Sequence, residues 1–278
     1  MKDLDKYYDA NRSMWDKFAK INYSSPDYRT KDFLNGASVL NSIELKELGD
    51  VKGKRLLHLQ CHFGLDTLSW AREGASVTGV DFSGEAIALA KDLAEKTNID
   101  ATFIQANIYD LPEVLNDNEQ FDIVYTSYGV LCWLPDLKRW AEIIAHFLKP
   151  GGTFYIAEGH PMLWVFDNEG PDDFKMVRSY FSRSEPYSFD VDGSYAESDV
   201  KFESQKDFEW AHGMGDIITS LVNAGLQIRF LHEHAKFPFQ LFPFFKKSEE
   251  GYWVYDNPEI QIPLMFSIKA TKEYDLHP

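Results

Sequence analysis

The chain has few cysteines and no long apolar run, and each absence excludes a class of protein. Its two cysteines, Cys61 and Cys132, lie in different segments, which argues against a disulfide framework and a zinc cluster. No run of about 18 apolar residues occurs, so a membrane-spanning helix is not expected. The beginning of the chain is polar and mixed in charge, without the apolar stretch of a secretory signal. We therefore expect a cytoplasmic protein.

Basic residues are also scarce. The chain has 28 Lys and Arg against 44 Asp and Glu, which gives a net charge of −16, and its basic residues do not cluster. A protein that binds nucleic acid neutralises phosphates with Lys and Arg. The composition thus argues against tRNA, rRNA or DNA as a substrate, although the acidity can also simply keep the protein soluble.

Short apolar runs alternate with helical patterns in the middle of the chain. These runs predict strands at residues 55–59, 76–80, 102–105, 121–126 and 153–157. Helices are predicted at residues 65–73 and 84–96 and after Asp136, with Ser83 and Asp136 as N-caps. This alternation indicates β-α-β units and a doubly wound, mostly parallel α/β sheet.

The rest of the chain is predicted to complete the same domain. A helix at 217–224 precedes a strand at 226–231, and Ile262, Leu264, Phe266 and Ile268 alternate as if on one face of a final strand. We divide the chain into four predicted parts. They are an N-terminal helical cap (1–50), a Rossmann-like core (51–160), a substrate-side insertion (161–210) and a C-terminal helix with the last two strands (211–278).

A nucleoside-site pattern follows the first two predicted strands. The loop from Gln60 to Gly64 leads from the first strand into a helix, and Asp81 ends the second strand about 20 residues later. A carboxylate at this position accepts hydrogen bonds from ribose hydroxyls. The alternative is that Asp81 only caps the helix that follows it.

These segments resemble the motifs of class I (Rossmann-like) methyltransferases that depend on S-adenosyl-L-methionine (SAM). The resemblance rests on five segments in the family's order, at residues 56–64, 77–83, 106–112, 121–136 and 148–154. It implies a seven-stranded sheet whose last strand is antiparallel. The loop sequence HLQCHFG resembles that of a bacterial subgroup, which leaves the substrate open.

The resemblance also implies which residues bind the cofactor SAM. They are His58, Gln60, Cys61, His62, Gly64, Asp81, Phe82, Ser83, Asn107, Ile108, Ser127, Tyr128 and Trp133.

Three of these residues depart from the family's first motif. His58 stands where the family has an acid, and Gln60 and His62 stand where it has glycine. We expect these changes to alter how the methionine end of SAM is held. If His58 lies near the cofactor's ammonium group, repulsion should grow as its imidazole gains a proton, and SAM affinity should decline from about pH 8 to about pH 6.

Few residues are obvious catalytic candidates, because methyl transfer from a sulfonium mainly needs alignment and exclusion of water. His160 follows the fifth strand and is a candidate base, or else a loop residue held by Pro161. Tyr128 is a second catalytic candidate. It follows the fourth strand, as does Trp133, and both can line the methyl-transfer site, or Trp133 can be core packing. His232 and His234 lack a third ligand, so no metal is expected.

Aromatic residues are dense outside the core. Trp15, Tyr23, Tyr28 and Phe33 are expected to fold over the cofactor, as the leading helices of the family do. The aromatic residues of 164–195 and 237–255 either wall an apolar pocket or pack an irregular cover.

The resemblance implies methyl transfer from SAM to an unidentified small molecule. Two alternatives remain: a non-catalytic Rossmann-like protein and an NAD(P)-dependent oxidoreductase. The few glycines of the first loop argue against the second, because a pyrophosphate needs close backbone approach. The oligomeric state is left open.

Overall fold

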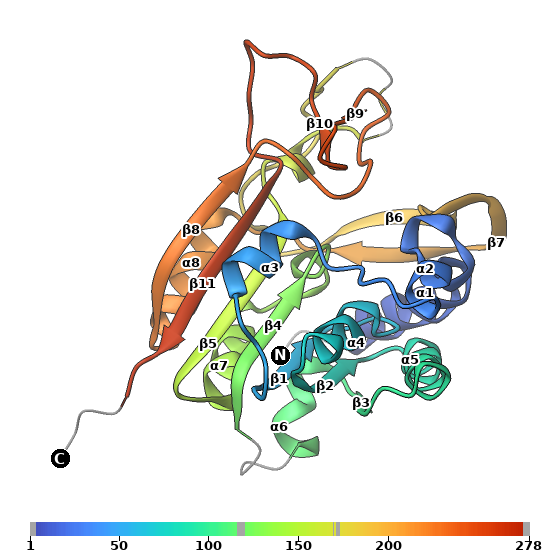
Figure 1. Ribbon diagram of the computed structural model, residues 1–278. Helices are drawn as coiled ribbons and strands as arrows, with labels where there is room; N and C mark the ends of the chain where they lie inside the picture. Colours follow the sequence, from blue (N-terminus) through green and yellow to red (C-terminus); the bar gives the residue numbers. More distant parts are fainter. Residues whose placement is uncertain (1–3, 116–119, 169, 171–172, 275–278) are drawn as a thin grey trace.

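A seven-stranded sheet forms the centre of the computed structural model, which describes residues 4–115, 120–168, 170 and 173–274. The strand order is β3-β2-β1-β4-β5-β11-β8 (Figure 1). Strands β1 to β5 are parallel, and β11 is antiparallel to both β5 and β8. The α/β class, the seven strands and the antiparallel last strand are all confirmed. The strands are β1 (Arg55–Leu59), β2 (Ser76–Asp81), β3 (Ala101–Gln105), β4 (Phe121–Ser127), β5 (Leu148–Gly159), β8 (Leu226–His234) and β11 (Met265–Lys272).

Helices cover both faces of this sheet, which explains why its central strands are apolar on both sides. One face carries α3 (Ser42–Leu48), α4 (Leu65–Arg72) and α5 (Gly84–Thr97). The other carries α6 (Leu111–Val114), α7 (Leu137–Phe147) and α8 (Met214–Asn223). Short 3₁₀ turns lie at η2 (Ile108–Asp110), η3 (Leu131–Trp133) and η4 (Leu163–Val165).

The two predicted N-caps are confirmed. Ser83 Oγ accepts a hydrogen bond from the N–H of Ala86 (3.0 Å) at the start of α5. Asp136 Oδ1 accepts from the N–H of Arg139 (3.0 Å) at the start of α7. Each bond satisfies a backbone donor that a helix leaves unpaired in its first turn.

The prediction for the last strand is partly wrong. Strand β11 begins at Met265, so Ile262 and Leu264 precede it. Phe266 and Ile268 pack with α7 and α8, whereas Leu264 packs on the opposite side of the sheet with α3. Alternation misled here because β11 is an interior strand whose two faces are both buried, so it shows no polar face.

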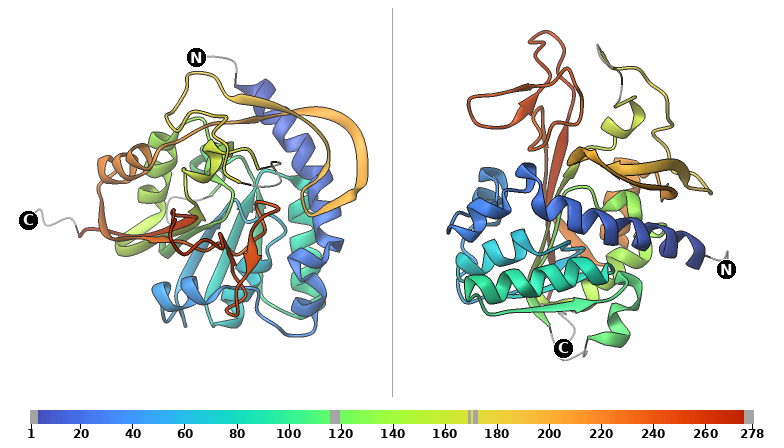
Figure 2. Two further views of the ribbon diagram at one scale, coloured as in Figure 1. Left: turned by 90° about the horizontal axis from the view of Figure 1, so that it is seen from above. Right: turned by 90° about the vertical axis from the view of Figure 1, so that its right-hand side faces the viewer.

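The N-terminal segment packs against a β-hairpin that the sequence did not predict. The segment comprises α1 (Asp5–Ser24), η1 (Pro26–Tyr28) and α2 (Thr30–Leu34), and the hairpin comprises β6 (Tyr187–Ser194) and β7 (Glu197–Glu209). Figure 2 shows α1 lying between this hairpin and α5. The buried amide of Asn11 donates to the carbonyl of Phe208 (2.8 Å) and accepts from its N–H (2.9 Å). These two bonds join α1 to β7.

A second aromatic segment lies above the carboxyl end of β5, around β9 (Lys246–Lys247) and β10 (Trp253–Val254) (Figure 1). The ring of Phe174 lies within 4.6–5.3 Å of four other aromatic rings, measured between centroids. They belong to Phe166, Phe242, Phe244 and Tyr255. For these residues the structure favours packing over a pocket wall.

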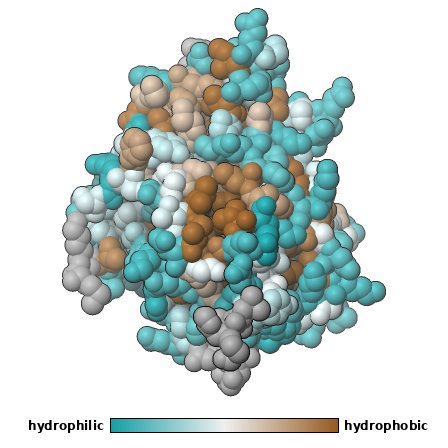
Figure 3. All heavy atoms as spheres, turned by 90° about the vertical axis from the view of Figure 1, so that its left-hand side faces the viewer, coloured by the Kyte–Doolittle hydropathy of each residue, from teal (hydrophilic) through white to brown (hydrophobic). Residues whose placement is uncertain are grey.

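The edge strand β8 and helix α8 form an outer side of the molecule. Figure 3 shows this side, where apolar residues gather at the centre and polar residues surround them. Val222 at the end of α8 is 52% exposed. In the part of the chain that the structure describes, no helix is long and apolar enough to cross a bilayer. The cytoplasmic location and the four-part division of the chain stay predictions.

Candidate cofactor site

The loop after β1 keeps the backbone path of a glycine-rich loop although two of its residues are not glycine. Gln60, His62 and Gly64 all have positive φ angles, of 57°, 51° and 77°. Only glycine adopts this left-handed region at no cost, so Gln60 and His62 hold it under strain. Between them, Cys61 is buried and its N–H donates to the carbonyl of Val80 (2.9 Å). The loop therefore has left-handed backbone at all three positions, although only one of them is glycine.

Gly64 is required for a reason that does not apply to Gln60 or His62. A Cβ added at Gly64 would lie 2.7 Å from ring carbons of Phe103 and 3.1 Å from the Cβ of Ala90. These contacts come from β3 and α5, which pack against the start of α4. Glycine at this position allows the close packing of helix and sheet that positions the loop.

Asp81 holds the loop by its side chain. Its Oδ2 accepts from the backbone N–H of His62 (2.8 Å), and its Oδ1 accepts from that of Ser83 (2.9 Å). Burial raises the pKa of Asp81 to about 6, and the two backbone donors oppose the rise. Each oxygen has a second lone pair, so the carboxylate can still accept from a ligand's hydroxyls. The capping alternative and the ribose prediction are thus compatible.

Polar atoms without partners gather at this loop. Among the described residues, Gln60 Oε1, His62 Nε2 and Trp15 Nε1 are buried and have no hydrogen bond. The ring of Trp15 meets those of His62 and Trp133 edge to face, at centroid distances of 5.2 and 5.4 Å. Buried polar atoms are normally paired. Three unpaired ones around one loop indicate a place built for a polar ligand.

His58 does not behave as the sequence suggested. It is 2% exposed, and its Nδ1 lies 2.8 Å from Thr67 Oγ1 while its Nε2 lies 3.3 Å from Ser127 Oγ. Burial lowers the pKa of His58 to about 3, so the ring is neutral at pH 6 to 8. The buried, hydrogen-bonded ring of His58 therefore argues against a loss of SAM affinity through its protonation. His62 is also neutral in this range, because burial lowers its pKa to about 3.

The predicted adenine and ribose neighbours lie beside the ends of β2 and β3. Asn107 Oδ1 accepts from the N–H of Tyr109 (3.1 Å) and begins η2. Ile108 is buried in the core against α7, and Phe82 is partly buried. Ser83 Oγ donates to Asp16 Oδ1 of α1 (2.6 Å). None of these contacts tests binding, so the roles of these four residues stay predictions.

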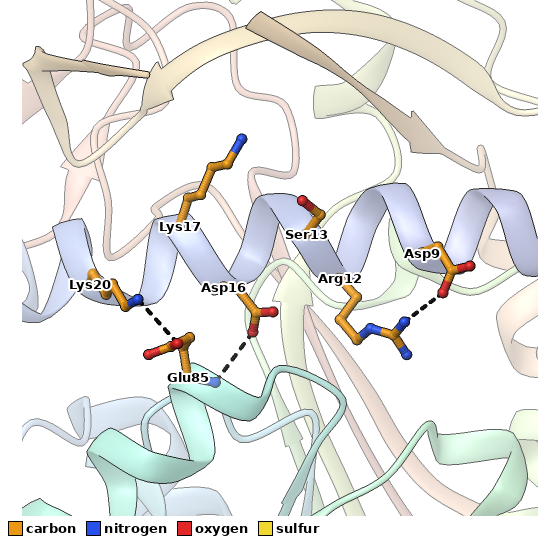
Figure 4. A pocket seen from close by; sticks show the side chains of 7 residues that line it. All are labelled: Asp9, Arg12, Ser13, Asp16, Lys17, Lys20 and Glu85. Atoms are coloured by element: carbon orange, nitrogen blue, oxygen red, sulfur yellow. Dashed lines mark hydrogen bonds and ion pairs between the residues drawn. The ribbon is translucent and has the colours of Figure 1, made fainter. Parts of the chain in front are cut away.

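Helix α1 is attached to α5 next to the loop. Asp16 also accepts from the N–H of Glu85 (3.3 Å), and Lys20 pairs with Glu85 (3.1 Å) (Figure 4). These residues line an open hollow of about 350 Å³ on the polar side of α1. The attachment positions Trp15 over the loop. Tyr28 lies there too, with its ring 5.4 Å from that of His62. Tyr23 contacts the Phe63 ring (5.7 Å).

The two catalytic candidates have other partners. His160 Nδ1 accepts from the N–H of Met162 (3.1 Å), and His160 Nε2 lies 2.9 Å from Glu233 Oε1. Both nitrogens are thus engaged, which favours the interpretation of His160 as a held loop residue. Tyr128 has a φ of 31°, and its hydroxyl donates to Glu44 Oε2 (2.5 Å). The polar atoms of both side chains are thus engaged, and their catalytic roles stay predictions.

Glu158, at the end of β5, orders the loop after β4. Its carboxylate accepts from the backbone N–H groups of Gly129 (2.5 Å), Val130 (2.7 Å) and Leu131 (3.3 Å). Trp133 Nε1 donates to the carbonyl of Gly129 (2.7 Å). This anchored turn holds Trp133 against Trp15.

Sequence reasoning missed three acidic residues at the site: Asp16, Glu44 and Asp66. Glu44 had a detectable signal, because Asn41 and Glu44 have the spacing of a helix capping box and form one. Asp66 Oδ2 accepts from Ser127 Oγ (2.9 Å), which no local pattern reveals. Within the described ranges, no three His, Cys, Asp or Glu side chains are arranged to hold a metal ion.

Comparison with known proteins agrees with this geometry. Residues 57–156 match the sequence model of the methyltransferase domain family. This stretch runs from β1 through the loop to β5 and includes Asp81. Residues 57–156 are therefore similar to a methyltransferase domain.

Relatives of this domain are known among bacterial enzymes. The chain is 28% identical over 158 residues to a ubiquinone biosynthesis O-methyltransferase of Coxiella burnetii, which covers 56% of this chain and 60% of that enzyme. It is 33% identical over 121 residues to the enzyme of the same name from Alkalilimnicola ehrlichii, which covers 43% and 48%. The match thus spans about half to three-fifths of the length of these relatives.

Solved structures share the fold over most of the chain. An S-adenosylmethionine-dependent methyltransferase from Mesorhizobium loti superposes with a TM-score of 0.59 at 21% identity, covering 86% of this chain and 99% of that one. A SAM-dependent methyltransferase from Methanosarcina mazei gives 0.55 at 20% identity, covering 85% and 99%. At these identities the likeness establishes the fold.

Proposed function

We propose that this protein transfers a methyl group from SAM to a small molecule. The observation that carries the proposal is the loop of Gln60, His62 and Gly64, whose left-handed path and unpaired polar atoms meet Asp81 at the ends of β1 and β2. The methyltransferase domain match and the O-methyltransferase relatives support it.

The residues at the loop fit SAM. Asp81 would accept hydrogen bonds from the ribose, Asn107 and Ile108 would flank the adenine, and the loop from Gln60 to Gly64 would face the methionine end. Because SAM has no phosphate, the bulk of Gln60 and His62 is compatible with it. SAM supplies a methyl group activated on a sulfonium. Trp15 and Trp133, whose rings meet edge to face, would help to exclude water and could contact the sulfonium through their rings.

The acceptor side lies beyond β4 and β5. A hollow of about 20 Å³, room for a single water, lies there between Leu131, Trp164 and Trp210. Glu158 also lines it, but its carboxylate is occupied by backbone N–H groups. These walls suit a small acceptor with an apolar body, and side chains would have to move to admit it.

Thermal unfolding with three ligands tests the proposal. SAM and S-adenosylhomocysteine should each raise the melting temperature, because a ligand at 100 times its Kd adds about 2.7 kcal/mol to the free energy of unfolding. NAD should not raise it. A shift with NAD alone would indicate an oxidoreductase, and no shift with millimolar SAM or S-adenosylhomocysteine would favour a non-catalytic protein.

A further inference from the structure

Two acidic side chains from different helices, Asp66 and Glu44, bind neighbouring residues at the end of β4, Ser127 and Tyr128. Asp66, in the first turn of α4, accepts from Ser127 Oγ through Oδ2 (2.9 Å), and its Oδ1 has no hydrogen bond among the described residues. Glu44, on α3, is fully buried. Its oxygens accept from the N–H of Asn41 (2.8 Å) and from the hydroxyl of Tyr128 (2.5 Å). Asp66 thus retains a free oxygen, whereas Glu44 is fixed in place.

In the part of the chain that the structure describes, no basic side chain pairs with these two acids. Neither Glu44 nor Asp66 forms an ion pair with Lys or Arg in the described part of the chain. Burial raises the pKa of both groups, and the charge of Asp66 raises that of Glu44 further. Among the described residues, the other titratable groups near the pair are uncharged at neutral pH. They are His58 of β1, Cys61 of the loop, Tyr28 of η1, Tyr125 and Tyr128 of β4, and Tyr155 of β5.

A third group independently indicates a ligand. Tyr125 is fully buried, and its hydroxyl has no hydrogen-bond partner among the described residues. Burial raises the pKa of that hydroxyl, and the nearby charges of Glu44 and Asp66 raise it further. A buried hydroxyl without a partner is costly unless something else pairs with it.

Ser127 connects this cluster to the residue that replaces the family's acid. Its Oγ lies 3.3 Å from Nε2 of the neutral His58 and 2.9 Å from Asp66 Oδ2. A negative charge that His58 cannot provide is therefore present two hydrogen bonds away, on Asp66 of α4, through Ser127 at the end of β4.

We propose that Asp66, with Glu44 behind it, is the anionic subsite that receives the α-ammonium group of SAM, in place of the acid that His58 replaces. This inference rests on the proposed function. An ammonium at the free oxygen of Asp66 offsets the desolvation of both carboxyls, so binding favours their ionised forms. Ligands that carry the ammonium should therefore release protons from the pair when they bind.

Binding calorimetry with two ligands tests the subsite. S-Adenosylhomocysteine carries the amino-acid end, whereas methylthioadenosine shares its adenosine and sulfur but lacks that end. Asp66→Asn should weaken S-adenosylhomocysteine binding at least tenfold and leave methylthioadenosine binding within twofold. Glu44→Gln should weaken S-adenosylhomocysteine binding by a smaller factor than Asp66→Asn does. Glu73→Gln, at an exposed position just after α4, removes the same charge away from the site and should change neither.

The outcomes separate this proposal from the one it rests on. Equal weakening of both ligands in folded Asp66→Asn would mean that Asp66 only supports the loop, and unchanged S-adenosylhomocysteine binding would remove it from the site. Either result overturns the subsite and leaves the proposed function intact. If the wild type binds neither ligand, the proposed function itself fails.

Proton release gives a second readout. Phosphate and Tris have different enthalpies of ionisation. If S-adenosylhomocysteine releases a proton when it binds at pH 7, the observed binding enthalpy should therefore differ between the two buffers. Asp81 can also release a proton when the ribose binds. Because both ligands carry the ribose, the release measured with methylthioadenosine is subtracted as the contribution of Asp81. The excess release with S-adenosylhomocysteine should disappear in Glu44→Gln. An excess that persists in both Glu44→Gln and Asp66→Asn would overturn the proposal.

Discussion

Three residues of the cofactor loop have left-handed backbone, but only one of them is required to be glycine by packing. Gly64 must be glycine because Phe103 occupies the space of a Cβ. Gln60 and His62 have the same kind of φ angle, but their side chains are accommodated, and Gln60 Nε2 donates to the carbonyl of Val130 (3.0 Å). Two non-glycine residues held in this strained conformation are typical of a functional site.

The clash at Gly64 can be measured separately from backbone strain. Gly64→Ala should lower the free energy of unfolding by about 2–5 kcal/mol, because a left-handed alanine costs about 1–2 kcal/mol and overpacking adds about 1–3. Gly53→Ala is the matched control, since Gly53 has a φ of 73° and nothing within 4 Å of a Cβ. Urea denaturation should show a clearly smaller loss for Gly53→Ala. Equal losses would mean that Phe103 does not restrict this position.

Asp81 should control affinity through its charge. Its pKa is raised to about 6, so the carboxylate is lost as pH falls through 6, and S-adenosylhomocysteine affinity should drop between pH 7 and pH 5.

Asp81→Ala should cost roughly 1–3 kcal/mol of binding free energy at pH 7. Calorimetry on folded protein measures both, with the exposed Asp100→Ala as control. Unchanged affinity in Asp81→Ala would exclude contact with the ribose.

At the scale of elements, the pairing of α1 with β7 creates the cover of the site. The helix was predicted, and its role as a cap was expected from the resemblance. The hairpin was not, because the alternation of residues 187–209 is broken by register shifts and by polar residues on both sides. Its partner α1 lies more than 160 residues away in the chain, and that contact supplies the apolar surface on which the hairpin forms.

Breaking this pairing should loosen the cover without unfolding the core. Asn11→Ala leaves the N–H and carbonyl of Phe208 without their partner, which should cost about 1–3 kcal/mol. Hydrogen exchange should speed up in residues 5–24 and 187–209 and stay unchanged in β1 and β4. Asp9→Asn, at an exposed position of the same helix whose ion pair with Arg12 stays within α1, should have little effect. Uniformly faster exchange in Asn11→Ala would instead show that α1 belongs to the cooperative core.

Across the whole molecule, buried titratable groups set how stability depends on pH. Burial raises the pKa of Glu209 to about 7 and also raises that of Glu44. Such acids bind protons more tightly in the folded state, so they lower stability as pH rises toward their folded pKa values. His58 and His62, with pKa values lowered to about 3, have the opposite effect, but only below about pH 6.5.

The acids should therefore dominate above pH 6.5. We expect the free energy of unfolding to fall between pH 6.5 and pH 8, and the fall to be smaller in Glu209→Gln. Urea denaturation at three pH values in this window measures the slope. Glu203→Gln, at an exposed position on the same strand, should leave the slope unchanged. A slope of zero in the wild type would mean that these carboxyls are not desolvated in solution.

The sequence by itself determined the order of strands and helices from β1 to β5 and the residues at the strand ends. These features depend on local patterns, such as apolar runs, the N-caps Ser83 and Asp136, and the position of Asp81 at the end of its strand. The positions of Gln60, His62 and Gly64 in one loop followed in the same way.

Only the tertiary structure decided what those residues face. It made His58 neutral by burial, and it engaged both nitrogens of His160 with Glu233 and Met162. It also brought Glu44 and Asp66 to Ser127 and Tyr128 from separate helices. A pKa and a hydrogen-bond partner depend on groups that are distant in sequence and close in space, and no local pattern records such neighbours.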